Sequence, residues 1–410
     1  MEKIIDPLND FENIFINNME NNPEDILKMF YQPDYFSLAN GFLPWIIIMR
    51  NRQLNGIGEY DKEVHRLLKN KIIKGNIEQF DDASLFLGLS GVYYTLCISA
   101  DDGRYDDVIK SVYPYLESLI LLKIKQADEN LKNGQVKVDD YDVVNGLSGI
   151  LKCLIHPKVS PYILNEDIIH KVKKTVENYI ITANTDSIKN LPFYLQSEDF
   201  LFDTEINKSL INLSHSHGIF GVINSLLDYY YLFPEKQLKD RIISISNYLL
   251  KFYNKETKSW LKRIYINGKN SFEQTNCSWC YGDLSIMYTF NKVSKLTKDN
   301  EYLNILNDFL NNIKISSSLY PSPTFCHGKA GVLLQLILLE LNEEKNKVYK
   351  DLMRDYNENY SYKFRDCEQI DERKYYFDKN NFLTGSLGIN LVLDLFEGQE
   401  DYVMWSKLVL

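Results

Sequence analysis

The sequence has few glycines and prolines and no excess of positive charge. Of its 410 residues, 19 are glycine and 11 are proline, while 45% are hydrophobic. These proportions exclude disordered, collagen-like and low-complexity chains, and they leave ample apolar side chain for a sizeable core. The net charge of −10 and the pI of about 5.3 argue against a protein that grips phosphate backbones, which needs clustered Lys and Arg. We therefore expect a globular protein with no nucleic-acid partner.

Targeting signals and long apolar runs are also scarce. Residues 1–6 are charged and lack the apolar core and small-residue cleavage site of a signal peptide. The best membrane candidate, 84–100, contains two glycines and is shorter than the roughly 20 residues that span a bilayer. We interpret it as a buried helix and expect a cytoplasmic protein without a transmembrane segment. Its six cysteines are then reduced thiols rather than a disulfide framework.

A short motif with two small residues three positions apart recurs along the chain. Six clear copies and a weaker first one occupy residues 40–44, 87–91, 145–149, 217–221, 281–285, 327–331 and 384–388. The first glycines of successive copies are 46 to 72 residues apart, which is room for two helices and their loops. Such a period is typical of a repeat architecture.

The residues that follow and separate the motifs have helical patterns. Apolar runs such as 332–341 and 389–396 follow the motifs and predict helices buried on most sides. The stretches between motifs are amphipathic and predict outer helices at 168–181, 238–253 and 302–313. Glycines three apart share a helical face, so they would let packed helices approach closely. Strand signals are few, and we predict short hairpins at 191–202 and 260–266.

These observations predict one all-α domain over residues 1–410. We expect an α/α toroid, or barrel, of about seven inner and seven outer helices. The longest interval, between the third and fourth motif copies, is where a small insertion would sit.

Ionisable residues stand at equivalent places in four of the motif copies. Asp142 precedes the third copy, His217 opens the fourth, Cys280 precedes the fifth, and Cys326 and His327 lead into the sixth. In a ring of repeats, equivalent positions come to the same end of the barrel, so we expect these groups to converge.

Cys280, Cys326 and His327 form a donor set that zinc prefers. Three protein ligands with an open fourth position are typical of a catalytic zinc site, and two thiolates suit sulfur alkylation better than hydrolysis. Alternatives remain, because a buried cysteine is more often a packed hydrophobe. Cys277 and Cys280 form a Cys-x-x-Cys pair that would suit redox chemistry, and Cys277 would also serve as a ligand.

We expect the other cysteines and histidines to have structural roles. We assign packing roles to Cys97, Cys153 and Cys367, and surface or core roles to His65, His156 and His170. His215 is a weaker site candidate than His217.

Four motifs carry a resemblance to a known family. They are Trp279-Cys280-Tyr281-Gly282, Cys326-His327-Gly328, His217-Gly218-x-x-Gly221 and Tyr141-Asp142-Val143-x-x-Gly146. Together they resemble the lanthionine synthetase C-like family, and in particular its bacterial lantibiotic cyclases. The resemblance spans roughly residues 37–396.

The resemblance implies an α/α toroid and a zinc-dependent, thioether-forming cyclase. Such an enzyme adds a peptide cysteine thiol to dehydroalanine or dehydrobutyrine and so forms lanthionine or methyllanthionine. The implied zinc ligands are Cys280, Cys326 and His327.

The implied catalytic residues are His217, Asp142 and Tyr281. His217 matches the acid/base histidine that protonates the enolate. Asp142 matches an aspartate that assists thiol deprotonation or orients a neighbour, and Tyr281 would hydrogen-bond in the site or simply pack.

One position departs from the family pattern. Four residues before Cys280 the family usually has arginine, and this chain has Asn276. Asparagine donates hydrogen bonds but carries no charge, so either another cation such as Arg263 or Lys329 substitutes, or activity is reduced.

The resemblance also implies partners. We expect a dehydrated lantibiotic precursor peptide as substrate, and a dehydratase and an ABC-type exporter in a membrane-associated complex at the inner face of the membrane. Alternatives are glutathione-type thiol addition to dehydrated proteins and a non-catalytic, zinc-bearing peptide scaffold. A carbohydrate enzyme on the same fold would need paired carboxylates at one end of the barrel. Near the motifs we find only Asp142 and Asp283, so the sequence does not favour that alternative.

Overall fold

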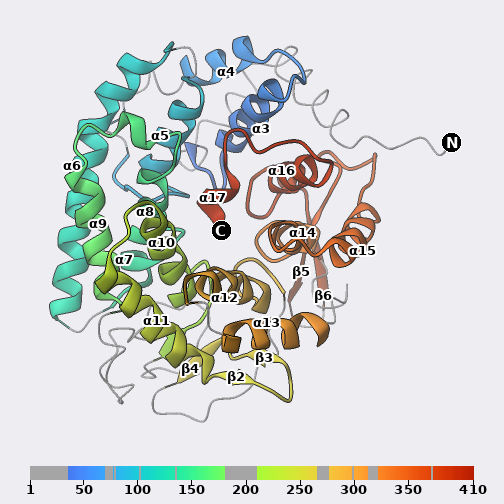
Figure 1. Cartoon of the computed structure of the whole chain (residues 1–410). Coiled ribbons are helices and arrows are strands. Elements are labelled where there is room, and N and C mark those ends of the chain that lie inside the picture. The colour runs from blue at the N-terminus through green and yellow to red at the C-terminus, as the bar shows by residue number, and fades with distance from the viewer. Residues whose placement is uncertain are drawn as a thin grey trace. The chain divides into compact units, whose positions relative to one another are not determined.

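The computed structural model describes residues 36–69, 77, 80–100, 103–133, 136–180, 210–265, 277–297, 300–312, 322–370 and 373–410. The chain forms two compact units, whose helices and strands are labelled in Figure 1. The first unit is Met1–Glu59 with Ile315–Tyr402, and the second is Tyr60–Lys314 with Val403–Leu410. None of the helices in the described ranges combines the length and apolar character needed to cross a bilayer.

The second unit is built mainly of helices. They are α4 (Asp61–Leu68), α5 (Leu89–Ile98), α6 (Asp106–Lys132), α7 (Val138–Tyr141), α8 (Leu147–Leu154), α9 (Asp167–Asn178), α10 (Ile219–Leu232), α11 (Lys236–Leu250), α12 (Asp283–Thr297), α13 (Asn300–Asn312) and α17 (Ser406–Val409). Its described residues also form a 3₁₀ turn, Ser160–Tyr162, and four short strands: β1 (Leu210–Asn212), β2 (Tyr253–Asn254), β3 (Ser259–Trp260) and β4 (Arg263–Tyr265).

The described residues of the first unit form four helices and one hairpin. These are α3 (Leu43–Leu54), α14 (Lys329–Leu338), α15 (Asn342–Met353), α16 (Ser386–Phe396), β5 (Asp366–Ile370) and β6 (Arg373–Phe377). Helix α14 packs against α15 and α16, and α16 packs against α3.

Each of the seven motif copies leads directly into a helix, as predicted. These helices are α3, α5, α8, α10, α12, α14 and α16. They are apolar and buried: every residue of α5 and of α8 is buried. Consecutive members are neighbours, since α8 packs against α5 and α10, and α10 packs against α12.

The glycines serve a different contact from the one predicted. Gly146 caps α8, and a Cβ there would lie 2.2 Å from the backbone nitrogen of Asp142. In Gly149 a Cβ would lie 2.0 Å from the carbonyl oxygen of Val143 and 3.0 Å from Leu85 Cβ. We predicted close approach of helix to helix, whereas the glycines admit the helix's own preceding loop and the loop of the previous repeat.

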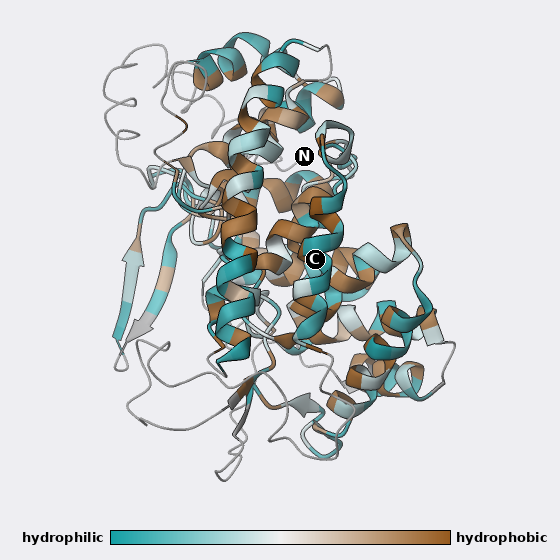
Figure 2. Cartoon of the chain, turned by 90° about the vertical axis from the view of Figure 1, so that its left-hand side faces the viewer, coloured by the Kyte–Doolittle hydropathy of each residue, from teal (hydrophilic) through white to brown (hydrophobic). Residues whose placement is uncertain are grey.

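Amphipathic helices α9, α11 and α13 stand where outer helices were predicted. Helices α6 and α9, which face the viewer in Figure 2, carry both hydrophilic and hydrophobic residues along their length. After α16 the described chain ends in the four-residue α17, which packs on α8 with Leu408 and Val409 buried, because this segment is apolar.

The strands differ from the predicted hairpins. Segment 191–202 lies outside the described residues. Segment 260–266 is divided between two sheets, because β3 pairs with β2 and β4 pairs with β1, both antiparallel. The β5–β6 hairpin was missed, since β6 is exposed at all five residues and so has no alternating apolar pattern.

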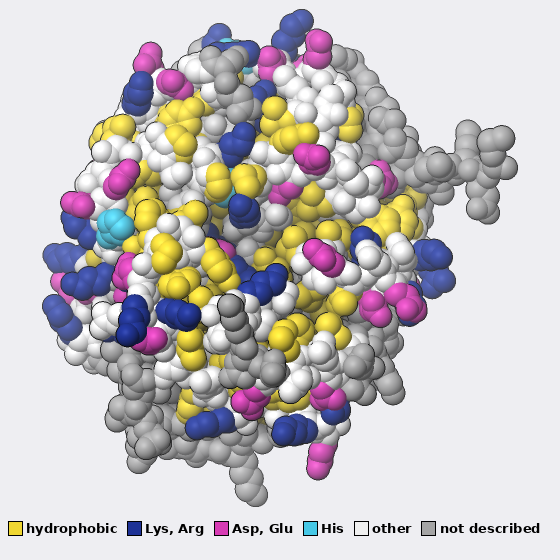
Figure 3. All heavy atoms as spheres, viewed as in Figure 1, with side chains coloured by type: hydrophobic (Ala, Val, Ile, Leu, Met, Phe, Trp, Pro, Cys, Tyr) yellow, Lys and Arg dark blue, Asp and Glu magenta, His cyan; other side chains and the backbone are white. Residues whose placement is uncertain are grey.

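Basic and acidic side chains are interspersed on the face shown in Figure 3. Apolar side chains lie between them without any dominant charge of one sign.

Candidate active site

The loops in front of α8, α10 and α12 lie side by side in the second unit. The Val143 N–H donates to the carbonyl oxygen of Ser216 at 3.0 Å, and the His215 N–H donates to that of Cys280 at 3.2 Å. The Ser216 hydroxyl also donates to the Cys280 carbonyl, at 3.3 Å. Three consecutive motif copies therefore present their ionisable residues at the same end of their helices, as the repeat predicted.

Asp142 and His217 form a hydrogen-bonded pair. Asp142 Oδ2 lies 2.6 Å from His217 Nδ1, and Asp142 Oδ1 accepts the N–H groups of Asn145 and Gly146 at 2.6 Å each. The carboxylate is fully buried, while the His217 side chain is 33% exposed. The Tyr141 hydroxyl donates to the His217 carbonyl at 3.2 Å, so backbone and ring are both held. This geometry leaves Nε2 as the ring atom that would exchange a proton.

The pair shifts the titration of both groups. Burial by itself lowers the pKa of His217, but the hydrogen bond and negative charge of Asp142 outweigh it, so that the pKa of His217 is raised. Burial raises the pKa of Asp142 against the opposing hydrogen bonds from His217 and Asn145. A histidine with a raised pKa beside a buried carboxylate can hold a proton near neutral pH and deliver it.

Tyr281 stands beside His217, with ring centroids 6.3 Å apart. The side-chain amide of Asn212 donates to the Tyr281 hydroxyl at 2.9 Å. Asn212 is paired with Arg263 across the β1–β4 ladder. Burial raises the pKa of Tyr281, and the hydrogen bond from Asn212 and the positive charge of Arg263 oppose that rise. The predicted residues Asp142, His217 and Tyr281 are thus brought together.

The two cations considered as substitutes differ in their surroundings. Asn276 itself lies outside the described residues. Lys329 belongs to the first unit, is 6% exposed, and donates to Asp355 at 2.6 Å and pairs with Asp351 at 3.2 Å. Arg263 lies close enough to influence Tyr281 electrostatically and is therefore the better placed of the two.

Cys280 lies beside the same group. It is 9% exposed, and the Ser278 hydroxyl is 3.6 Å from its sulfur. A negative charge on Cys280 would raise the pKa of both His217 and Tyr281, so the thiol is near both rings. An Asp–His pair, a phenol and a thiol therefore share one site in the second unit.

The weaker candidates lie in the interior. His215 is fully buried and donates from Nε2 to the Val409 carbonyl at 2.8 Å, and burial lowers its pKa to about 3, so its ring is neutral. Burial raises the pKa of the Cys277 and Cys153 thiols to about 12. His156 is also buried and contacts the Met404 carbonyl at 3.0 Å.

Cys326 and His327 lie in the turn before α14 in the first unit. The Cys326 N–H donates to the Leu383 carbonyl at 2.8 Å, which joins this turn to the loop before α16. His327 Nε2 lies 3.0 Å from Oδ1 of Asp366, the first residue of β5. The His327 side chain is 31% exposed, whereas that of Asp366 is fully buried.

Asp366 is the centre of a small polar network. The Ser322 hydroxyl donates to its Oδ1 at 2.8 Å, and Lys379 donates to its Oδ2 at 2.9 Å and to Glu368 at 3.1 Å. Burial by itself raises the pKa of Asp366, but the hydrogen bonds from His327, Lys379 and Ser322 bring it down to about 2. The carboxylate is therefore ionised throughout the physiological range.

From the sequence we did not identify Asn212 or Asp366 as partners of site residues. We named Arg263 as one of two possible cations. Asp366 lies 39 positions from His327 and Asn212 lies 69 positions from Tyr281. No motif or spacing in the sequence links the two residues of each pair, because the segments that carry them come together only when the chain folds.

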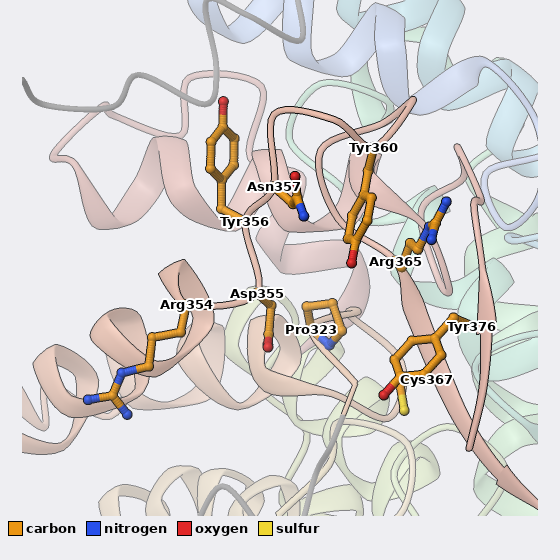
Figure 4. A pocket seen from close by; sticks show the side chains of 9 residues that line it. All are labelled: Pro323, Arg354, Asp355, Tyr356, Asn357, Tyr360, Arg365, Cys367 and Tyr376. Carbon is orange, nitrogen blue, oxygen red and sulfur yellow. The ribbon is translucent and has the colours of Figure 1, made fainter. Parts of the chain in front are cut away.

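A cavity of about 180 Å³ lies on the other face of the β5–β6 hairpin from Asp366. Cys367 and its cross-strand partner Tyr376 face it, since successive strand residues point to opposite sides. Its lining is rich in tyrosine and arginine and comprises Pro323, Arg354, Asp355, Tyr356, Asn357, Tyr360, Arg365, Cys367 and Tyr376 (Figure 4). Arg365 stacks on Tyr360 and pairs with Asp378, so its charge is already compensated.

Comparison with known proteins finds a family model, a relative and a solved structure that are similar to this chain. The family model described as "Lanthionine synthetase C-like protein" matches residues 34–410. The nisin biosynthesis protein NisC of Lactococcus lactis subsp. lactis is 25% identical over 401 residues, which cover 91% of this chain and 88% of NisC. Among solved structures, a nisin cyclase matches with a TM-score of 0.72 and 19% identity over 97% of each chain. The fold is therefore that of the nisin cyclase, an α/α toroid, and the predicted fold class is confirmed.

Proposed function

Because this chain belongs to the lanthionine synthetase C-like family, we propose that it is a lanthipeptide cyclase. It would add cysteine thiols of a dehydrated precursor peptide to dehydroalanine or dehydrobutyrine, forming lanthionine and methyllanthionine rings. The observation that carries the proposal is the buried Asp142–His217 pair with Tyr281 and Cys280 beside it. A buried carboxylate that orients a histidine is the arrangement needed for general acid–base catalysis.

We propose Zn²⁺ as the cofactor, with Cys280, Cys326 and His327 as ligands. Among the described residues, no three or more His, Cys, Asp and Glu side chains form a metal-binding group, so the ligand set is proposed from the residue types and the family resemblance. The residues fit zinc in two ways. Two thiols and an imidazole are a catalytic zinc donor set, and His327 hydrogen-bonds a buried carboxylate through its other nitrogen, as metal-ligating histidines do. Bound there, zinc would lower the pKa of a substrate cysteine and keep its sulfur reactive as a thiolate.

His217 would supply the proton that completes the addition. As the substrate sulfur bonds to the β-carbon, the electrons of the carbon–carbon double bond move toward the carbonyl and form an enolate. His217 then gives its Nε2 proton to the α-carbon, while Asp142 holds Nδ1 and stabilises the protonated ring. No atom leaves, so the peptide mass is unchanged. The proton lost by the thiol balances the one gained at carbon.

Arg263 would supply the positive charge that the family's usual arginine carries and that Asn276, at the same position, lacks. A cation near the developing enolate stabilises it, and Arg263 already acts on Tyr281. Arg263→Met should therefore lower kcat, and Arg263→Lys should restore part of it. Equal kcat values for the methionine variant and the unmodified protein would contradict this role.

The substrate and partners follow from the same function. We propose that the dehydrated precursor reaches the enzyme from a dehydratase and leaves through an ABC-type exporter, in the cytoplasm at the inner face of the membrane. Co-purification of this chain with those two partners, and loss of the association when either is deleted, would test the complex.

One incubation tests the reaction itself. The zinc-loaded protein is mixed with a dehydrated, cysteine-containing precursor, and free thiols are counted with an alkylating reagent. A cyclase removes free thiols without changing the mass of the peptide, and Cys326→Ala abolishes that loss. Unchanged thiol counts with folded, zinc-bound protein would refute the function. The Asp142→Asn variant separates catalysis from zinc binding, since it should slow ring formation and leave the zinc content intact.

A further inference from the structure

We propose that Asp366 is a positioning residue that fixes His327 as a zinc ligand through Nδ1, with Lys379 and Ser322 holding Asp366 in place. The inference rests on the zinc site proposed above. It concerns a residue of the β5–β6 hairpin that lies outside the repeated motifs.

The carboxylate is held by three donors, two from the loop before α14 and one from the segment after β6. Oδ1 accepts from His327 Nε2 at 3.0 Å and from the Ser322 hydroxyl at 2.8 Å, and Oδ2 accepts from Lys379 at 2.9 Å. Its side chain is fully buried. A buried carboxylate with both oxygens engaged cannot rotate freely, so it holds the imidazole in one orientation.

His217 in the second unit and His327 in the first engage their carboxylates through opposite ring nitrogens. Asp142 engages Nδ1 of His217, whereas Asp366 engages Nε2 of His327. The hydrogen bond at one ring nitrogen decides which nitrogen remains for chemistry. His217 is thereby set to exchange a proton at Nε2, and His327 is set to ligate through Nδ1, the ring nitrogen nearer the main chain.

Lys379 completes the arrangement. Its ammonium bridges Asp366 and Glu368 and lies 4.8 Å from the centre of the Phe377 ring. It therefore ties the end of β6 to β5 and balances the charge of the buried carboxylate. Glu368 shares this lysine, and its carboxylate binds Lys379 rather than His327, which makes it the matched control.

The first experiment measures zinc affinity by competition with a chelator. Loss of a carboxylate behind a histidine ligand typically weakens metal binding about 10–100-fold, and we expect this for Asp366→Ala. Asp366→Asn keeps an oxygen that accepts from Nε2, so part of the affinity should return. Glu368→Gln, on the same hairpin, should bind zinc as tightly as the unmodified protein. Equal affinity of Asp366→Ala and the unmodified protein would overturn the inference.

The second experiment separates positioning from a general structural role. In a His327→Ala background, adding Asp366→Ala should cause no further loss of zinc affinity, because Asp366 acts through His327. A further loss of the same size would overturn the inference. The spectrum of bound Co²⁺ gives an independent readout, since Asp366→Asn should alter it and Glu368→Gln should not.

Failure of the zinc site and failure of this inference are distinguishable. Absence of zinc binding by the unmodified, folded protein overturns both. Tight binding by the unmodified protein that Asp366→Ala and Asp366→Asn leave unchanged overturns the role of Asp366 alone. Thermal melts of each variant confirm folding, and the asparagine variant, which conserves shape, keeps the test valid if alanine unfolds the hairpin.

Discussion

Replacing Asp142 by asparagine should move the pH dependence of ring formation. The substitution removes the negative charge 2.6 Å from His217 Nδ1. It retains an oxygen for the N–H groups of Asn145 and Gly146, so the cap of α8 survives. The new amide would donate to Nδ1, which leaves a neutral ring with its hydrogen on Nε2.

The size of the shift follows from the lost interaction. A hydrogen bond to a charged group contributes about 1.5–3 kcal/mol, and one pKa unit corresponds to about 1.4 kcal/mol. The His217 side chain is 33% exposed, so screening by solvent favours the lower part of that range. Loss of that interaction should therefore lower the pKa of His217.

The direction can be checked against the role of the histidine. His217 acts in its protonated form, and Asp142 raises its pKa, so activity is present below that pKa and is lost as the pH rises through it. In Asp142→Asn the alkaline limb of the kcat profile should therefore appear at lower pH.

The assay is thiol loss from a dehydrated precursor, followed from pH 5 to pH 10 at saturating substrate. Asp139→Asn is the control, because Asp139 is an exposed residue of α7 whose charge also raises the pKa of His217 but whose side chain does not bond to the ring, so its effect should be the smaller one. An alkaline limb at the same pH in Asp142→Asn and the unmodified protein, both folded, would refute the proposed pairing.

Three further predictions follow from the same structure. His217→Gln should lower kcat about 10²–10⁴-fold with its zinc content unchanged, as measured by metal analysis, and full activity would exclude it as the proton donor. Cys326→Ala should lose zinc while Cys153→Ala, a buried thiol outside the site, keeps it; equal zinc content in both would remove Cys326 from the ligands. Gly149→Ala should lower the free energy of unfolding in urea by about 1–3 kcal/mol, because its Cβ would meet the Val143 carbonyl oxygen, and an unchanged midpoint would contradict that packing.

The repeated motif was sufficient to predict the helices, because its signal is local. Each small-residue pair is followed by an apolar run, and each run begins a buried helix such as α8 or α14. The reason for the glycines was not readable in the same way. Whether a missing Cβ admits a helix or a loop depends on what packs there, and in Gly149 it is the Val143 carbonyl and Leu85 of the previous repeat.

The strands show the same limit. The β5–β6 hairpin contains charged and exposed residues instead of the alternating apolar and polar residues that would have predicted its strands. Its register is set by pairing between neighbours in space, and the charges that hide it from a pattern search are those that bind Lys379 and His327.

The sequence by itself was sufficient to establish that glycine and proline are scarce outside the motifs and that the motif repeats. It was also sufficient to identify the candidate site residues Asp142, His217, Cys280, Cys326 and His327. These are properties of residue type and spacing along the chain, so they need no coordinates. The tertiary structure alone decided the partners of those residues. Asp142 takes one nitrogen of His217 and Asp366 the other nitrogen of His327, because only folding brings segments 75 and 39 positions apart within hydrogen-bonding distance.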